Sequence, residues 1–238
     1  MDFLGFSISE LEKKAIVDLL SEAVQKGRKM HLVTLNPEML ACQSRNHRFR
    51  EVLKRAELLI PDGMGIIWGA RFLGQTPIRR LPGIELAEAL LERGRDEGWR
   101  VYLLGGKEGV AEKAAEVLCR RYPGLQIVGV HHGYCADDAQ VVRAINQTAA
   151  TLLLVGMGSP RQELWIDTYR DALIPSLFMG VGGSFDVWSG EKKRAPYFVR
   201  RLGFEWLWRV GSEPQRVRRV LPSFFRFGVL LLRERIQR

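Results

Sequence analysis

The sequence has few cysteines and no long apolar run, which argues against disulfide-rich and membrane-spanning proteins. Its three cysteines, Cys42, Cys119 and Cys135, have spacings that fit neither a disulfide framework nor a zinc pair. We therefore expect small buried thiols in a reducing compartment. The longest late apolar run, residues 227–232, is far shorter than the roughly 18 residues that a membrane-spanning helix needs.

The N-terminus lacks the basic stretch and the long apolar stretch of a signal peptide. The sequence also contains no G-x-S-x-G, P-loop or H-E-x-x-H motif, which argues against three common kinds of catalytic site. The lack of a signal peptide and of a long apolar run predicts a cytoplasmic protein that is not integral to the membrane.

Lysine is absent from residues 196–238, and acids are scarce there. This segment holds ten arginines against three acids, Glu205, Glu213 and Glu234, and so carries +7 of the formal net charge of +9. Aromatic side chains are interleaved with the arginines. A segment of this kind suits a nucleic acid, a lipid headgroup or a phosphorylated substrate, and charge alone does not choose among them.

Short apolar runs alternate with segments of helical periodicity through the first 195 residues. The strand-like runs are 30–35, 57–60, 100–105, 125–130, 151–156 and 176–181. Helical periodicity marks 84–98, 110–122 and 136–150. Ser9 and Glu12 have capping-box spacing ahead of a further helix that ends near Gly27. The alternation predicts an α/β fold with a Rossmann-like layered core around a mainly parallel sheet.

Strand signals stop near Pro196, and Pro214 and Pro222 divide the rest into about three short amphipathic helices. We therefore predict an α/β core over residues 1–195 and a helical appendage over residues 196–238. A hairpin packed on the core, or a dimer interface, is the other interpretation of the appendage.

Polar residues gather where the predicted strands end, which is where open α/β sheets bind ligands. The first run ends with Thr34 and Asn36, and Asn36 before Pro37 also suits a helix N-cap. The second run ends with Asp62, followed by glycines that leave room for a ligand near the backbone. An aspartate before a glycine is also a common turn, so both interpretations stay open.

Glycine-rich corners follow three later runs, and such corners favour anions. Their glycines are Gly105, Gly106, Gly156, Gly158, Gly182 and Gly183. Arg161 and Gln162 add a charge and an amide beside Gly158, and Asp186 offers an acceptor for ribose hydroxyls.

Nine motifs in order resemble the WecG/TagA/CpsF glycosyltransferases over nearly the whole chain. They are TLNPE (34–38), PDGMG (61–65), RLPG (80–83), GGKEG (105–109), HGY (132–134), GMGSPRQE (156–163), VGGSFD (181–186), RAP (194–196) and EWLWR with EPQR (205–216). The resemblance implies a bacterial enzyme that moves N-acetylmannosamine from UDP to undecaprenyl-diphosphate-linked N-acetylglucosamine. It implies inverting chemistry without a metal or cofactor, at the inner face of the membrane, for teichoic acid or a related surface polymer.

The resemblance also implies roles for residues. Asp62 would be the catalytic base, with Thr34, Asn36, Arg80 and Gln162 lining the same pocket. Residues expected at the UDP-sugar are Gly105, Gly106, Tyr134, Gly156, Gly158, Arg161, Gly182, Gly183 and Asp186. Residues expected at the lipid diphosphate are Arg209, Arg216 and Arg219. Cys135 stands where relatives often carry an aromatic residue.

Other interpretations stay open. Within the same family, the donor could carry N-acetylmannosaminuronic acid or another sugar. A nucleic-acid-binding module would use the basic segment to clamp phosphates, but the polar cleft in the core favours catalysis. A nucleotide-binding oxidoreductase is disfavoured because LLGGKEG lacks the G-x-G-x-x-G spacing. Self-association into a homo-oligomer is a further possibility.

Overall fold

The computed structural model describes residues 1–76, 78–134 and 137–237. The side chains of Arg209, Pro214 and Arg219 also lie outside the described part. The predicted roles of Arg209 and Arg219, and the departure at Cys135, therefore fall outside the described residues.

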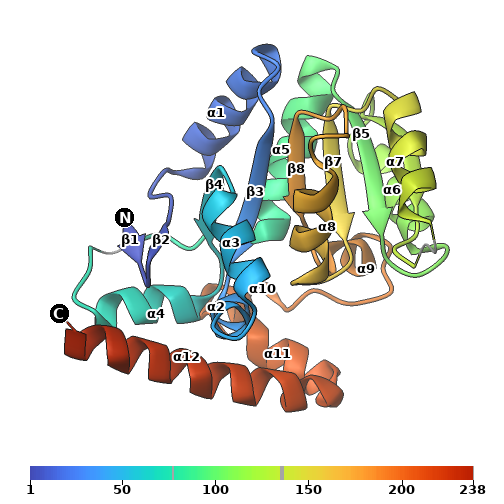
Figure 1. The fold of residues 1–238 in the computed structure, drawn as a ribbon. Helices are drawn as coiled ribbons and strands as arrows, with labels where there is room; N and C mark the ends of the chain where they lie inside the picture. Colours follow the sequence, from blue (N-terminus) through green and yellow to red (C-terminus); the bar gives the residue numbers. More distant parts are fainter. Residues whose placement is uncertain (77, 135–136, 238) are drawn as a thin grey trace.

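Six parallel strands form the central sheet, in the order β4-β3-β8-β7-β5-β6 (Figure 1). They are β3 (Met30–Leu35), β4 (Leu58–Pro61), β5 (Arg100–Gly105), β6 (Gln126–His131), β7 (Leu152–Gly156) and β8 (Leu177–Gly180). A short antiparallel hairpin of β1 (Asp2–Phe3) and β2 (Phe6–Ser7) precedes the sheet. Every predicted strand is present with bounds shifted by at most one residue, and the predicted α/β fold is confirmed.

Helices cover both faces of the sheet. One face carries α1 (Lys13–Gln25), α5 (Gly83–Glu97), α6 (Val110–Arg121) and α9 (Ser184–Trp188). The other carries α2 (Pro37–Gln43), α3 (His47–Arg55), α7 (Asp138–Gln147) and α8 (Arg161–Tyr169). On β5, Val101 and Leu103 pack under the first layer, whereas Tyr102 and Leu104 pack under the second. This alternation explains why the strands are apolar throughout.

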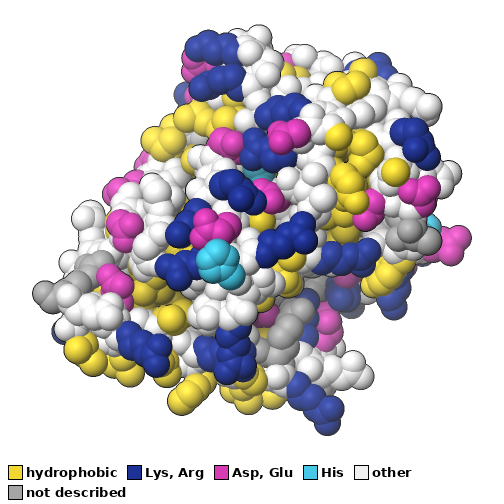
Figure 2. Space-filling model, in the orientation of Figure 1, with side chains coloured by type: hydrophobic (Ala, Val, Ile, Leu, Met, Phe, Trp, Pro, Cys, Tyr) yellow, Lys and Arg dark blue, Asp and Glu magenta, His cyan; other side chains and the backbone are white. Residues whose placement is uncertain are grey.

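A further group of helices lies below the carboxyl ends of the strands (Figure 1). It contains α4 (Met64–Phe72), which follows β4, and the C-terminal elements α10 (Tyr197–Arg201), α11 (Glu205–Ser212), η1 (Pro214–Arg216) and α12 (Val217–Gln237). Helix α12 runs along α2 and α4 (Figure 1). Its Phe227 is 5% exposed and belongs to the apolar cluster that contains Phe3 and Ile66. In Figure 2, hydrophobic and cationic side chains lie side by side along the edge that α12 forms.

Two local predictions were wrong. Ser9 does not cap the first helix, because residues 8 and 9 run beside β4 and Ser9 N donates to Leu59 O at 2.8 Å. The helix begins instead at Lys13, with Glu12 as the N-cap residue. Pro222 does not end a helix but lies inside α12. A proline removes one backbone hydrogen bond, and the packing of α12 on the core outweighs that loss.

The prediction of buried thiols is also wrong for one cysteine. Cys119 is exposed and Cys42 is partly buried, and both are free. Cys119 lies on the outward side of α6, whose inward positions Ala111, Ala114 and Leu118 fill the core.

None of the helices in the described part of the chain is both long and apolar enough to cross a bilayer.

The docking of α12 on the core can be tested by comparing two phenylalanines of the same helix. Phe227→Ala should lower the free energy of unfolding by about 3–5 kcal/mol, because it empties a filled apolar site. Phe225 is 75% exposed, so Phe225→Ala should change stability by about 0.5 kcal/mol or less. Urea unfolding of both variants measures the difference. Equal small effects would mean that α12 is not docked in solution.

Candidate active site

The parallel order of the sheet brings the carboxyl ends of all six strands to one edge. Strand β7 connects through α8 to β8 on one side, whereas β5 connects through α6 to β6 on the other side. The strand order therefore reverses between β7 and β5, and open α/β sheets bind ligands at such a point. Asp62 and Thr34 lie toward the β4 end of this edge, and the later glycine corners lie at and beyond its centre.

Asp62 is positioned by the neighbouring strand and by a helix N-terminus. Its backbone N–H donates to Leu35 O at 2.8 Å, and its Oδ2 accepts from Gly83 N at 3.3 Å. Gly83 is the first residue of α5, and a helix N-terminus favours a carboxylate. A Cβ on Gly83 would lie 3.0 Å from Thr34 Oγ1, so Thr34 borders the same position. The side chain of Asp62 stays 28% exposed and accessible to a ligand.

Gly65, three residues after Asp62, has a packing role. A Cβ on Gly65 would overlap Pro37 Cγ, so the glycine lets α4 begin against the start of α2. Asn36 caps α2, with Oδ1 accepting from Met39 N at 3.0 Å and Pro37 in the first turn. The local interpretation of Asn36 is therefore confirmed, and its role toward a ligand remains a prediction.

Arg80 lies between two carboxylates. Its Nη2 donates to Glu205 Oε2 at 2.6 Å, and its Nε lies 3.8 Å from Asp62 Oδ1. Its Nη1 donates to the backbone oxygen of Arg200 at 3.3 Å. The Arg80 and Glu205 side chains are only 14% and 8% exposed. The structure thus brings Arg80 to Asp62, and it adds Glu205, to which the sequence analysis gave no role.

Gln162 links two of the glycine corners. Its Oε1 accepts from Gly158 N at 3.1 Å and from Gly182 N at 3.0 Å. Its Nε2 donates to Glu163 Oε1 at 2.7 Å, and both side chains are almost fully buried. Burial raises the pKa of the Glu163 carboxyl. A Cβ on Gly180 would overlap the Gln162 amide, so this arrangement requires the glycine.

The remaining corners differ in how much space they leave. At the β5–β7 boundary, Gly106 N donates to Gly156 O at 2.9 Å, and a Cβ on Gly105 would collide with the Gly156 backbone. These glycines allow the strand ends to approach each other closely. By contrast, Gly158 and Gly182 have positive φ, and nothing lies within 4 Å of a Cβ on either. The open positions at Gly158 and Gly182 are therefore where a ligand has room.

Tyr134 and Arg161 are brought together from different elements. The Arg161 guanidinium lies 5.7 Å from the centroid of the Tyr134 ring, and that ring is on a residue that is 68% exposed. Arg161 is the first residue of α8, so the pair stands beside the corner that contains Gly158. An exposed ring and a cation at a strand end form a surface on which a planar anionic ligand can rest.

Asp186 is joined to the C-terminal elements by a chain of charges. Lys192 Nζ lies 2.9 Å from Asp186 Oδ2 and 3.1 Å from Glu213 Oε1. Glu213 in turn lies 3.0 Å from Arg216. Burial alone would lower the pKa of Lys192, but its hydrogen bonds to the two carboxylates raise it. Neither Lys192 nor Glu213 was predicted as a site residue, although acids are rare enough in this arginine-rich segment to be noticeable.

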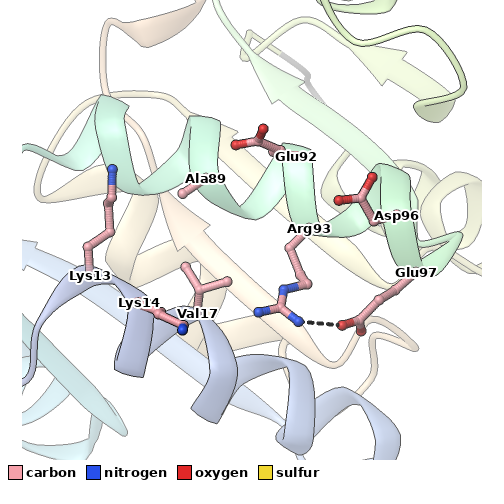
Figure 3. A pocket seen from close by; sticks show the side chains of 8 residues that line it. All are labelled: Lys13, Lys14, Val17, Ala89, Glu92, Arg93, Asp96 and Glu97. Carbon is pink, nitrogen blue, oxygen red and sulfur yellow. Dashed lines mark hydrogen bonds and ion pairs between the residues drawn. The ribbon is translucent and has the colours of Figure 1, made fainter.

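Two cavities elsewhere contain none of the predicted site residues. One, of about 340 Å³, lies between α1 and α5 and is lined by basic and acidic side chains, of which Arg93 and Glu97 are paired (Figure 3). The second, of about 410 Å³, lies between α3 and α8 and is lined by Arg55–Asp167 and Arg170–Glu57 ion pairs. Neither cavity is lined by a residue that follows the carboxyl end of a strand, so neither lies where the predicted site residues gather.

Comparisons with known proteins show the family of this chain. The sequence model of the glycosyl transferase WecG/TagA/CpsF family matches residues 1–238. The chain belongs to this family. Two relatives, from Staphylococcus aureus strains MW2 and NCTC 8325 / PS 47, are each 34% identical to it over 229 residues, which cover 94% of this chain and 90% of the relative. Both are named N-acetylglucosaminyldiphosphoundecaprenol N-acetyl-beta-D-mannosaminyltransferase. The family resemblance and the predicted enzyme class, a glycosyltransferase, are confirmed.

The structural role of Gln162 gives a prediction about stability. Gln162→Leu removes the acceptor of the Gly158 and Gly182 N–H groups, so we expect a loss of about 2 kcal/mol in the free energy of unfolding. The exposed Gln140→Leu is the matched control and should change stability little. Chemical unfolding measures both. If Gln162→Leu lost turnover with unchanged stability, its role would be in the chemistry rather than in joining the corners.

Proposed function

We propose that this enzyme transfers N-acetylmannosamine from UDP to N-acetylglucosamine linked to undecaprenyl diphosphate, with inversion and without a metal ion. The product would enter the synthesis of wall teichoic acid or a related surface polysaccharide. One observation carries the proposal: a partly exposed aspartate, Asp62, stands beside Arg80 on the same sheet edge as the open glycine corners. The names of the relatives support the choice of sugar and acceptor.

Asp62 would act as the general base. As the acceptor hydroxyl oxygen attacks the anomeric carbon, a bond forms between them and the bond from that carbon to the UDP oxygen breaks. The hydroxyl proton passes to the Asp62 carboxylate, which must lie within about 3 Å of the attacking oxygen. The Gly83 N–H fixes one carboxylate oxygen, and the other lies on the side of Arg80.

The negative charge that develops on the departing UDP needs a positive environment. Arg80 supplies a permanent charge beside the base, and Arg161 supplies another at the start of α8. The N-terminus of α8 adds its own partial positive charge next to the open position at Gly158. These positive groups would stabilise the negative charge on the departing UDP without a metal ion.

The C-terminal elements fit an acceptor that stays in the bilayer. Their exposed apolar side chains include Phe198, Leu202, Leu221, Phe225 and Ile236. Arginines lie among them, and a basic side chain near an anionic membrane contributes about 1 kcal/mol to binding. The segment 196–238 would therefore hold the enzyme peripherally at the inner face of the membrane, with Arg216 directed to the lipid diphosphate. By family resemblance, Arg209 and Arg219 would join it there.

The role of Asp62 can be tested with a nearly isosteric change. Asp62→Asn keeps the size of the side chain but cannot accept a proton, so we expect turnover to fall by at least about a hundredfold while UDP affinity stays near that of the wild type. Mass spectrometry with a short-chain lipid-linked acceptor and several UDP-sugars would measure turnover and identify the donor. Near wild-type turnover would exclude Asp62 as the base.

Membrane association can be tested without disturbing the core. Removing residues 197–238 would also remove the buried Phe227, so two outward residues of α12 are the sharper targets. Leu221→Asp with Phe225→Asp should weaken binding to vesicles of anionic phospholipid by at least about tenfold, because two apolar anchors become charged. Ile174→Asp, which changes an exposed apolar residue in the loop between α8 and β8, is the control. Unchanged vesicle sedimentation of the double variant would refute this role for α12.

A further inference from the structure

The C-terminal segment contributes an acid to the candidate site as well as arginines. Glu205 is the first residue of α11 and is 6% exposed. Its carboxylate reaches back to the core and receives the Arg80 guanidinium at 2.6 Å. The neighbouring helix α10 supplies a second acceptor, the backbone oxygen of Arg200, for the same guanidinium.

The two carboxylates beside Arg80 are not equivalent. Glu205 makes a short, charge-assisted hydrogen bond, whereas Asp62 lies 3.8 Å from the nearest Arg80 nitrogen, beyond hydrogen-bond distance. An arginine that paired closely with Asp62 would engage both carboxylate oxygens, as arginine–carboxylate pairs often do. Such a pair would hinder Asp62 from receiving a proton.

The surrounding charges explain why Glu205 fills this role. Another acid, Glu85 of α5, is already paired with Arg194 at 2.6 Å and with Arg200 at 3.4 Å. Arg80 is therefore held by the acid of α11, across 125 residues of sequence.

We propose that Glu205 is a positioning residue of the transfer reaction. It holds Arg80 through a short ion pair, so that the guanidinium stands beside Asp62 without closing on it. This inference rests on the proposed function, in which Asp62 is the base and Arg80 faces the leaving group. It makes the docked C-terminal segment a part of the catalytic geometry and not only a membrane anchor.

The test compares two acid-to-amide changes in the same segment of the full chain. Glu205→Gln should lower kcat at least tenfold, because Arg80 then turns to Asp62. UDP affinity, measured by calorimetry, should stay the same or become tighter, because one negative charge near an anion site is lost. Glu234→Gln makes the same charge change on α12 and should alter neither quantity.

A structural role would give a different result. If Glu205→Gln only loosened the fold, turnover, UDP affinity and the melting temperature would fall together, and that outcome would overturn the inference. Glu205→Asp keeps the charge and should retain more turnover than Glu205→Gln; equal losses would also overturn it.

The wild-type enzyme separates this inference from the proposed function. Absence of any sugar transfer by the wild type to the lipid-linked acceptor would refute the proposed function itself. Wild-type turnover together with an unaffected Glu205→Gln variant would refute only the positioning role.

Discussion

The parallel pairing of six strands is the constraint on which the rest of the molecule depends. Parallel strands require crossover helices, and these helices bury both faces of the sheet. All the carboxyl ends then meet at one edge, and the backbone there turns from strand to helix at each position. A carboxylate, a threonine and several bare glycine corners are brought to this edge from segments that are far apart in the chain.

The C-terminal segment completes this edge with charges of both signs. Its arginines are the more obvious feature, since they give the segment a net charge of +7. Yet two of its ion pairs with the core run through its acids, Glu205 to Arg80 and Glu213 to Lys192, beside the pair of Arg200 with Glu85. The first of these pairs is poorly exposed and so is weakly screened by solvent. This pair joins the segment directly to the candidate site.

Most of the fold could be predicted from the sequence because each strand is a continuous apolar run. Two of the wrong predictions, Ser9 as a cap and Pro222 as a helix end, share a cause: tertiary contacts decided the local conformation. Residues 8 and 9 run beside β4, and α12 is held by its packing on the core. Local propensity contains no information about either contact.

The candidate site was only partly predictable, for a similar reason. Asp62 and Thr34 could be assigned to one sheet edge because each stands at the carboxyl end of an apolar run, and the family resemblance placed them with Arg80 in one pocket. The link that Gln162 makes between two corners depends on the exact approach of two loops, which periodicity does not encode. The pair formed by Arg80 and Glu205 spans 125 residues, and neither residue type signals it in advance.

The central claim is that Asp62 receives the proton of the attacking hydroxyl group. A crystal structure with UDP and a lipid-linked acceptor analogue bound tests it most directly. The account predicts the reacting hydroxyl oxygen within about 3 Å of the Asp62 carboxylate and the UDP phosphates on the side of Arg80. A hydroxyl group placed against another side chain, or a donor bound at the opposite edge of the sheet, would contradict it.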